Sequence, residues 1–483
     1  MRSNPPGTAR TLAVLSALVL GFLGTTGTAQ AEPVTVPNGT QFTDPNGEPV
    51  HAHGGGVVKV GEYYYWFGEN RNADNSFRYV SAYRSTDLKT WEFRKHVLTQ
   101  ETDPELKGAN IERPKVMFNK STGKFVMWMH KEGSPTDYSE ARAAVAVSDT
   151  VDGDYSWKGS FRPFDEHMSR DITTFVDDDG TAYMISAANE NRDLHVYRLN
   201  SDYTKIEEQV QKLWAGQSRE APAMFKRDGV YFLLTSGATG WGPNQQKYAT
   251  ASSVTGEWSG LQDIGDNTTY RSQTAYVLPV QGTKGTDYMY MGDRWGNSMG
   301  GMVNDSKYVW LPLEFPTKTT MTMDYSPNLT VDTEAGSVSG MDVTWEKLTS
   351  RKSGKCADVS SFDTNDGAQF VQWGCGWGVN QHYWFKKLDS DHVQIMARHS
   401  GKCLDVKDAA TEDGAYAVQN TCDGRESQQW KVEQTDTDGY VRLIAKHSGK
   451  CLDVVNESTA DGAALQQWTC GNGDNQKWEH SAA

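Results

Sequence analysis

The stretch Ser400-Gly401-Lys402-Cys403-Leu404-Asp405-Val406 occurs three times, nearly unchanged, in the last third of the chain. The other two copies are 353–359 and 448–454, so the copies begin 47 and 48 residues apart. Each copy is followed by a Gln and then a Trp, as in Gln428 and Trp430. Short β-rich units that cannot bury a core alone must share one. The repeat therefore predicts a β-domain with threefold symmetry.

The cysteines of the chain all belong to this repeat: Cys356, Cys375, Cys403, Cys422, Cys451 and Cys470. The two cysteines of each unit are 19 positions apart. In an exported protein, an even set of cysteines at a repeated spacing indicates disulfides. Six cysteines allow many pairings, and the repeat selects the one in which each unit closes its own loop. A zinc site is the alternative, but it would need CxxC-type pairs, which the sequence lacks.

Residues 343–483 closely resemble the ricin-B-type β-trefoil, carbohydrate-binding module family 13, in their cysteines, Asp and Gln-x-Trp positions. The resemblance implies that each unit carries a sugar site made of an Asp, an aromatic side chain and a late polar residue. By position these are Asp358, Trp373 and Asn380; Asp405, Asn420 and Gln428; and Asp453, Trp468 and Asn475. The middle unit has Asn420 where the others have Trp, so we expect a weaker site there. We expect Trp384, Trp430 and Trp478 in the core, although the first unit reads Gln-His-Tyr-Trp instead of Gln-x-Trp.

A looser repeat occupies residues 32–335, where a glycine precedes a run of aromatic and apolar residues. Its copies are 61–69, 123–131, 180–186, 229–235 and 285–291. Short strands bounded by turn residues about every fifty positions are typical of propeller blades. The sequence thus predicts an all-β chain: a five-bladed β-propeller at 32–335, a linker at 336–342 and a β-trefoil at 343–483.

The first 31 residues have the pattern of a secretory signal peptide. Arg2 and Arg10 precede an apolar stretch at 12–23, and Ala29-Gln30-Ala31 is a small-x-small cleavage motif. The apolar run of roughly 12 residues is shorter than the ~20 that span a bilayer. The chain has 47 Lys and Arg against 62 Asp and Glu, a net charge of −15, which argues against a nucleic-acid partner. We therefore expect a secreted, extracellular monomer without membrane or nucleic-acid partners.

Acids and amides precede predicted strands at four places: 111–115 (Ile-Glu-Arg-Pro-Lys), 169–172 (Ser-Arg-Asp-Ile), 219–225 (Arg-Glu-Ala-Pro-Ala-Met-Phe) and 270–274 (Tyr-Arg-Ser-Gln-Thr). The inner strands of a propeller surround one central pocket, so these side chains are predicted to meet. Glycoside hydrolysis needs one protonated carboxyl and a second group that aims water or attacks directly. A lone Glu is more often a surface charge, but the repeat context and the Arg-Glu-Ala-Pro motif favour Glu220 as the acid.

With 51–56 (His-Ala-His-Gly-Gly-Gly), these motifs make residues 32–335 similar to glycoside hydrolase family 43, in particular its exo-β-1,3-galactanase branch. The resemblance implies that Glu220 is the general acid, Glu112 tunes its pKa and Gln273 holds the attacking water. In the broader family an Asp of the first blade is the general base. This chain reads His53-Gly54 near that position and lacks the Asp, so Glu69 and Asp293 are the alternative general bases. The resemblance also implies sugar contacts by Glu69, Tyr138, Asp171, Asn191, Thr239, Trp241 and Asp293.

The expected function is that of a secreted, exo-acting hydrolase that cleaves β-1,3-galactosidic bonds of galactan or arabinogalactan with inversion and releases galactose. One alternative is an α-L-arabinofuranosidase or β-xylosidase of the same fold; another is a secreted lectin without catalysis. No cofactor and no metal are expected. His51 and His53 have no third ligand at a suitable spacing, and 177–180 (Asp-Asp-Asp-Gly) is more typical of a hairpin turn than of a calcium loop.

Overall fold

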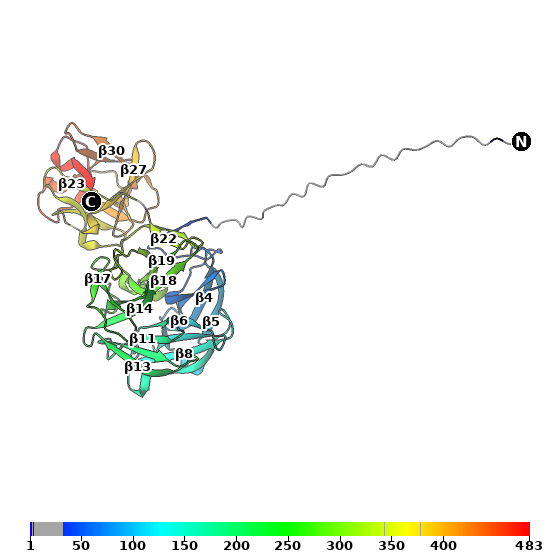
Figure 1. The fold of residues 1–483 in the computed structure, drawn as a ribbon. Helices are drawn as coiled ribbons and strands as arrows, with labels where there is room; N and C mark the ends of the chain where they lie inside the picture. Colours follow the sequence, from blue (N-terminus) through cyan, green and yellow to red (C-terminus); the bar gives the residue numbers. More distant parts are fainter. Residues whose placement is uncertain (2, 4–31, 342, 377) are drawn as a thin grey trace.

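A computed structural model describes residues 1, 3, 32–341, 343–376 and 378–483. The predicted signal peptide lies outside the described residues, apart from Met1 and Ser3. The described part contains strands and short 3-10 helices but no α-helix. No helix in this part is long and apolar enough to cross a membrane. Figure 1 shows two domains in contact, the second packed against the end of the first where β18, β19 and β22 lie.

Five antiparallel sheets form the first domain, and in each sheet the strands follow one another in chain order. The first blade contains β2 (His53–Val60), β3 (Tyr63–Arg71), β4 (Phe77–Ser85) and β5 (Glu92–Thr99). The second contains β6 (Asn110–Asn119), β7 (Lys124–Glu132), β8 (Arg142–Ser148) and β9 (Ser156–Phe161). The third contains β10 (Ile172–Val176), β11 (Ala182–Ala188), β12 (Asp193–Leu199) and β13 (Ile206–Leu213). The fourth contains β14 (Arg219–Arg227), β15 (Val230–Gly237), β16 (Gln246–Ala251) and β17 (Gln262–Ile264), and the fifth only β18 (Gln273–Gln281), β19 (Thr286–Arg294) and β20 (Lys307–Leu313).

The predicted five-bladed propeller is confirmed. Strands β2, β6, β10, β14 and β18 contact one another around a closed ring, and each predicted aromatic run forms the second strand of a blade. Apolar side chains fill the seams between blades; between the first and last blades, Trp66 packs against Trp91, Tyr308 and Trp310. The ring places the first residues of all the inner strands around one axis.

A sixth small sheet closes the propeller and corrects the predicted linker. Strand β1 (Val34–Pro37) pairs with β21 (Asn328–Asp332), which pairs with β22 (Ser337–Gly340). Most of the expected linker at 336–342 is therefore a strand of the first domain. Its small residues suggested a free segment, but Val338 is buried in the core and packs with Val331 and Leu329.

The second domain is the predicted β-trefoil. Its strands are β23 (Glu346–Ser350), β24 (Cys356–Val359), β25 (Ala368–Trp373), β26 (Tyr383–Lys387), β27 (His392–Ala397), β28 (Cys403–Val406), β29 (Ala417–Asn420), β30 (Trp430–Gln434), β31 (Val441–Ala445), β32 (Cys451–Val454), β33 (Leu465–Trp468) and β34 (Trp478–Ala482). The predicted pairing of cysteines is confirmed: disulfides join Cys356 to Cys375, Cys403 to Cys422, and Cys451 to Cys470.

The shared core of the trefoil contains Trp430 and Trp478, as expected, but not Trp384. Tyr383 is fully buried in its place, and Trp384 is only partly buried. The register explains the difference, because Gln381-His382-Tyr383 aligns with Gln428-Gln429-Trp430. Successive side chains of a strand point to opposite faces, so Trp384 turns away from the core.

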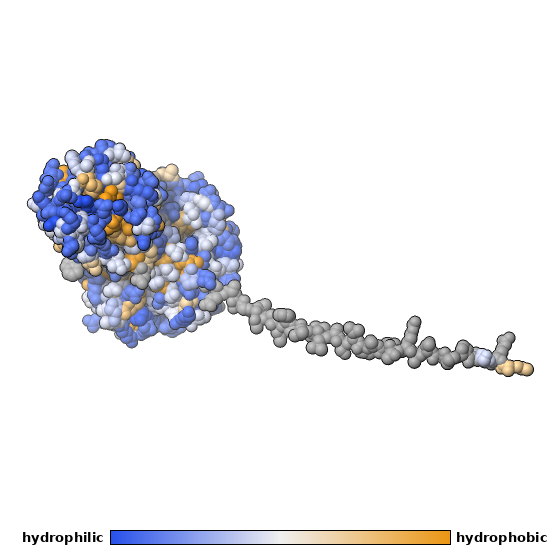
Figure 2. Space-filling model, turned by 90° about the horizontal axis from the view of Figure 1, so that it is seen from above, coloured by the Kyte–Doolittle hydropathy of each residue, from blue (hydrophilic) through white to orange (hydrophobic). Residues whose placement is uncertain are grey.

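Short 3-10 turns connect the strands: η1 (Pro104–Leu106), η2 (Pro163–Asp165), η3 (Gly296–Met299), η4 (Val303–Asp305), η5 (Ser360–Phe362), η6 (Val379–Gln381), η7 (Lys407–Ala409), η8 (Glu426–Gln428), η9 (Val455–Glu457) and η10 (Asp474–Gln476). Ion pairs join the domains, from Arg271 to Asp363 (3.3 Å) and from Arg398 to Asp324 (3.0 Å). In the view of Figure 2 the surface is mainly hydrophilic, with a few small apolar areas.

Candidate active site

A cavity of about 270 Å³ opens where the inner strands of the propeller begin. Predicted site residues that line it are Glu69, Glu112, Tyr138, Asp171, Asn191, Glu220, Trp241 and Gln273. Every blade contributes to this cavity, because these residues come from β3, β6, the start of β10, β14 and β18 and from the loops beside them. The topology thus unites residues that are far apart in the sequence.

A backbone bulge follows the predicted acids and has a left-handed residue at its centre. The inner strands change register after His53, Glu112 and Glu220, and the next residues, Gly54, Arg113 and Ala221, have φ of +62°, +53° and +52°. Each of these residues donates its N–H to a carboxylate of another strand: Gly54 to Asp293 (2.8 Å), Arg113 to Glu69 (2.9 Å) and Ala221 to Asp171 (3.0 Å). Left-handed non-glycine residues are strained and persist where their surroundings fix them. The three carboxylates provide that support.

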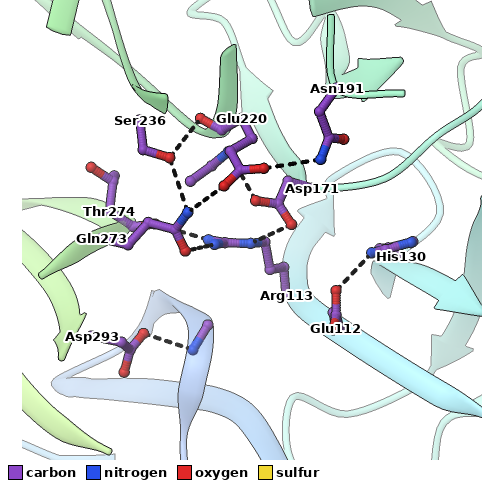
Figure 3. A network of polar contacts seen from close by, with 12 residues as sticks. Glu112, Arg113, His130, Asp171, Asn191, Glu220, Ser236, Gln273, Thr274 and Asp293 are labelled. Carbon is purple, nitrogen blue, oxygen red and sulfur yellow. Dashed lines mark hydrogen bonds and ion pairs between the residues drawn. The ribbon is translucent and has the colours of Figure 1, made fainter. Parts of the chain in front are cut away.

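Glu220 is almost buried in the wall of the cavity, and Figure 3 shows its carboxyl between Gln273, Asp171 and Asn191. Its Oε1 accepts a hydrogen bond from Gln273 (3.0 Å), and its Oε2 accepts one from Asn191 (2.9 Å). Burial and, next, the negative charge of Asp171 raise the pKa of Glu220 to about 8, while Arg113 opposes the shift. The carboxyl therefore keeps its proton at neutral pH, which is what a general acid requires.

The side-chain amide of Gln273 uses all of its hydrogen-bonding positions. Its Nε2 donates to Glu220 and to Ser236 Oγ (2.9 Å), and its Oε1 accepts from Arg113 Nη2 (2.6 Å) and Trp295 Nε1 (2.8 Å). An amide has two donor and two acceptor positions. In this state Gln273 holds the acid in place, and a water could bind to it only in exchange for one of these partners.

Arg113 connects the predicted site residues to one another. Its Nε pairs with Asp171 (2.9 Å), Nη1 donates to the carbonyl of Thr274 (2.8 Å) and Nη2 donates to Gln273. The guanidinium is nearly inaccessible, and its fixed fork of donors sets the spacing of these groups. The positive charge of Arg113 also keeps Asp171 paired close to Glu220.

Glu112 is held as an anion by a buried chain of charges. Burial alone would raise the pKa of Glu112, but hydrogen bonds from His130 and Tyr138 and the charge of Arg71 hold it well below its usual value. His130 Nδ1 lies 2.9 Å from Glu112 Oε2, and its Nε2 lies 2.8 Å from Glu132 Oε1. A neutral imidazole has only one N–H, so two carboxylate partners require the charged ring, and these carboxylates raise the pKa of His130 to about 9 against the effect of burial.

The alternative bases and Thr239 have other partners. Glu69 is buried and bonded to Arg71 (3.0 Å to Nε), and Asp293 is buried with its oxygens on His53 Nδ1 (2.9 Å) and Gly54 N. Thr239 bonds to the carbonyl of Gly242 (2.6 Å) in the loop that carries Trp241. Of these three residues, only Glu69 lines the cavity. In this structure Asp293 positions the first blade and Thr239 positions the loop of Trp241, and the sugar contacts predicted for both stay predictions.

One group of possible metal ligands occurs in the described part of the chain: Glu112, His130 and Asp171, whose ligand atoms lie within 4.8 Å of one another. Both nitrogens of His130 already face carboxylates, and Asp171 is bonded to Arg113 and to Ala221 N. A metal ligand needs a free lone pair on its nitrogen. The charged His130 offers none, so this group fits an ion-pair network better than a metal centre.

Asp171 has a larger effect than Glu112 on the pKa of Glu220, so Asp171→Asn is expected to change the pH profile most. A general acid at Glu220 must be protonated to act, so this prediction has activity falling as the pH rises through the pKa of Glu220. Removing a like charge lowers that pKa by roughly 1 unit or more, which moves the alkaline limb of kcat/KM to lower pH. Hydrolysis of β-1,3-galactobiose across pH checks this. A larger shift in Glu112→Gln than in Asp171→Asn would contradict the assignment.

Residues 51–294 match the family described as glycosyl hydrolases family 43, and residues 341–420, 380–468 and 426–483 match the ricin-type β-trefoil lectin domain-like family. The chain belongs to glycoside hydrolase family 43. A comparison with curated proteins gave no match. Because the family's members are glycoside hydrolases, this chain is one too.

Several solved structures similar to this family 43 hydrolase are exo-β-1,3-galactanases. The enzyme of Clostridium thermocellum is 47% identical, with 93% of this chain and 100% of that chain covered and a TM-score of 0.66. The enzyme of Phanerochaete chrysosporium, solved with β-1,3-galactotriose, is 28% identical, with 93% of each chain covered and a TM-score of 0.62. A putative enzyme of Bifidobacterium bifidum is 31% identical over 60% of this chain and 97% of that chain, with a TM-score of 0.56.

Several residues of the family 43 hydrolase site were not singled out in the sequence: Arg71, His130, Glu132, Ser236 and Trp295. His130 is the last residue but one of the predicted aromatic run 123–131, and Glu132 follows this run directly. A His and a Glu two positions apart on a strand share a face, and that spacing is the signal that could have found them. Ser236 and Trp295 carry no comparable pattern.

The trefoil of the family 43 hydrolase presents its predicted sugar residues unequally. Trp373 and Trp468 are 50% and 44% exposed, whereas Asp405 of the middle unit is fully buried beneath Asn420 (2.9 Å). The Gln of each Gln-x-Trp donates to the Asp of its unit: Gln381 to Asp358, Gln428 to Asp405 and Gln476 to Asp453. Asn475 also donates to Asp453 (2.7 Å), and both Asn475 and Asn380 donate to a strand carbonyl, Val454 (3.4 Å) and Val359 (3.0 Å). The exposed Trp faces agree with stacking sites in the outer units only.

Proposed function

We propose that this chain is an exo-acting hydrolase that cleaves β-1,3-galactosidic bonds of galactan and arabinogalactan with inversion and releases galactose. The observation that carries the proposal is the hydrogen bond between the buried carboxyl of Glu220, whose pKa is raised to about 8, and the neutral amide of Gln273 in one cavity. The first-blade position of the broader family's base is here His53-Gly54, pinned by Asp293. The similar solved enzymes of Clostridium thermocellum and Phanerochaete chrysosporium are exo-β-1,3-galactanases, which supports this choice.

In the proposed reaction Glu220 gives its proton to the leaving oxygen as the bond to the anomeric carbon breaks. The sugar displaces Gln273 from Glu220, and the freed N–H then aims a water at the opposite face of the ring. An amide is a poor base, so the water loses its proton only after its oxygen has bonded to the oxocarbenium-like carbon. That proton passes to solvent water, and solvent returns a proton to the Glu220 carboxylate, which restores the acid for the next turnover. Anionic Glu112 and Asp171 stabilise the positive charge that develops there, because they lie in a cavity shielded from water.

Substrate assays separate this proposal from its alternatives. We expect galactose from linear β-1,3-galactan and no hydrolysis of aryl α-L-arabinofuranosides or β-xylosides, because the base used for those substrates in the broader family is missing. Faster hydrolysis of either aryl glycoside would favour the arabinofuranosidase or xylosidase alternative. No release of reducing sugar from any of the three would favour the lectin.

We further propose that the catalytic domain spans 32–341 and the carbohydrate-binding trefoil 343–483, and that the chain works outside the cell as a monomer after removal of 1–31. Three disulfides support an oxidising compartment. The trefoil keeps the enzyme near its polymer by adding local concentration rather than chemistry.

The double variant Trp373→Ala and Trp468→Ala is expected to weaken retention on arabinogalactan by about tenfold or more, since it removes both exposed stacking faces. Hydrolysis of β-1,3-galactobiose should not change. The matched control is Asn420→Ala in the middle unit, which we expect to bind like the parent. Affinity electrophoresis in gels with and without polymer measures retention. Equal retention of the double variant and the parent would contradict these sugar sites.

A further inference from the structure

A second cavity, of about 370 Å³, lies in the seam between the last blade and the trefoil. The propeller contributes Arg294 and Lys307 to its wall, and the trefoil contributes Lys402, Asp366 and Thr421. The seam is distinct from the catalytic cavity, since none of these residues lines the latter. In Figure 1 it corresponds to the contact of the trefoil with the end of the propeller beside β19.

Two positive charges face each other in this seam without an acid between them. Arg294 and Lys307 are directly opposite residues of β19 and β20. Like charges directly opposite across two strands are destabilising. Within the described residues, neither side chain makes an ion pair with a carboxylate, and Arg294 Nε has no hydrogen-bond partner although Arg294 is only 3% exposed. The Nη2 atom donates to the carbonyl of Tyr270 (2.9 Å).

The nearby acid, Asp366, already forms an ion pair with Lys402, and this pair is repeated in the other two units of the trefoil. Lys402 binds Asp366 just as Lys355 binds Asp461 and Lys450 binds Asp413 in the other units. Lys402 of the middle unit lines the seam together with Arg294 and Lys307 of the propeller. Burial, and then the charges of Lys402 and Arg294, lower the pKa of Lys307. The seam is therefore a positive, partly buried site in a chain whose net charge is −15.

We propose that this interdomain cavity binds a small oxyanion, a carboxylate or sulfate, such as the acidic group of a charged sugar residue. Arg294 supplies its charge and the unpartnered Nε–H donor to such a group, and the ammonium of Lys307 supplies a point charge beside it. The hydroxyl of Thr364, which also lines the cavity, is a further donor to the bound group. A bound anion would neutralise the opposed cations and hold the two domains together.

The full-length protein is titrated with sodium sulfate and with sodium D-glucuronate, using D-glucose as the neutral probe and sodium chloride to keep the ionic strength equal. Calorimetry gives the affinity, and thermal unfolding gives the stabilisation. We expect at least one of the two anions to bind and to raise Tm. Substitution of Lys307 should not change any response of the protein to glucose. Binding of glucuronate indicates an acidic sugar, and binding of sulfate alone indicates a free inorganic anion. Binding of neither overturns the proposal.

Two substitutions and one matched control place the effect at this seam. Lys307→Gln should weaken anion binding by about tenfold or more, whereas Lys450→Gln, at the equivalent of Lys402 in the third unit, should not. Lys307→Glu supplies its own carboxylate to Arg294, so Tm should rise without added anion and the response to anion should vanish. Sulfate also stabilises proteins through exclusion from their surface; equal binding and equal Tm shifts in Lys307→Gln and Lys450→Gln would therefore overturn the proposal. If Lys307→Glu does not fold, Lys307→Gln alone decides.

Discussion

Replacing Glu220 by Gln is expected to lower kcat/KM on β-1,3-galactan by about 10²- to 10⁴-fold, the usual contribution of a general acid. The amide has nearly the shape of the carboxyl but cannot give up a proton. The neighbourhood can accommodate it, because the unpaired Oδ1 of Asn191 is able to turn toward the new N–H. We therefore expect a folded protein that still binds galactooligosaccharide.

Leaving-group dependence distinguishes loss of the acid from a general disturbance of the site. An aryl β-galactoside whose phenol is already acidic needs little protonation, so Glu220→Gln should impair its hydrolysis much less than that of galactan. Glu101→Gln, on an exposed turn, is the control and should behave like the parent. Retention of most of the parent's activity on galactan by Glu220→Gln would remove this residue from the acid role.

Both Gln273→Glu and Gln273→Ala are expected to be nearly inactive, with losses of about 10²-fold or more. In Gln273→Glu a carboxylate replaces the N–H that lies 3.0 Å from Glu220 Oε1. Two carboxyls at this distance share one proton, and the pKa of one of them is raised. The proton of Glu220 is then held by its neighbour instead of reaching the leaving oxygen. Gln273→Ala removes the amide that aims the acid and, in the proposed reaction, the water.

Ser236→Ala is the milder control for this position, since it removes only one acceptor of the Gln273 amide. We expect it to lose much less activity than either Gln273 variant. An enzyme that merely lacked a base would gain from an acid at position 273. A Gln273→Glu variant as fast as the parent and still inverting would show that this position accepts an ordinary base and that the water-holding assignment is wrong.

Repeats in the sequence were sufficient to predict the architecture. The Ser-Gly-Lys-Cys copies predicted the trefoil and its disulfides, and the glycine-led aromatic runs predicted the blades. Two details escaped because local composition was ambiguous. The expected linker contains a strand, because the side chain of Val338 is buried in the core of the first domain. In the trefoil, two aromatic residues after Gln381, Tyr383 and Trp384, were candidates for one core position, and Tyr383 occupies it.

The site was predictable as a set of residues but not as a network. The motifs around Glu112, Glu220 and Gln273 indicated which side chains meet, because all were predicted directly before inner strands. In the structure these residues are the first, second or third residue of β6, β14 or β18. The left-handed bulges at Arg113 and Ala221 could not be foreseen, since neither residue favours that conformation. The bulge at Arg113 directs its side chain into the site, where it contacts Asp171, Thr274 and Gln273.

The most direct test of the central claim is proton NMR of the parent enzyme acting on linear β-1,3-galactan, recorded from the first minutes of the reaction. Free galactose is expected to appear first as the α-anomer, because inversion of a β-bond sets that configuration, and the β-anomer should grow only as the sugar equilibrates. Initial release of β-galactose, or release of oligosaccharides without galactose, would contradict an inverting exo-hydrolase in which Glu220 is the acid and Gln273 aims the water.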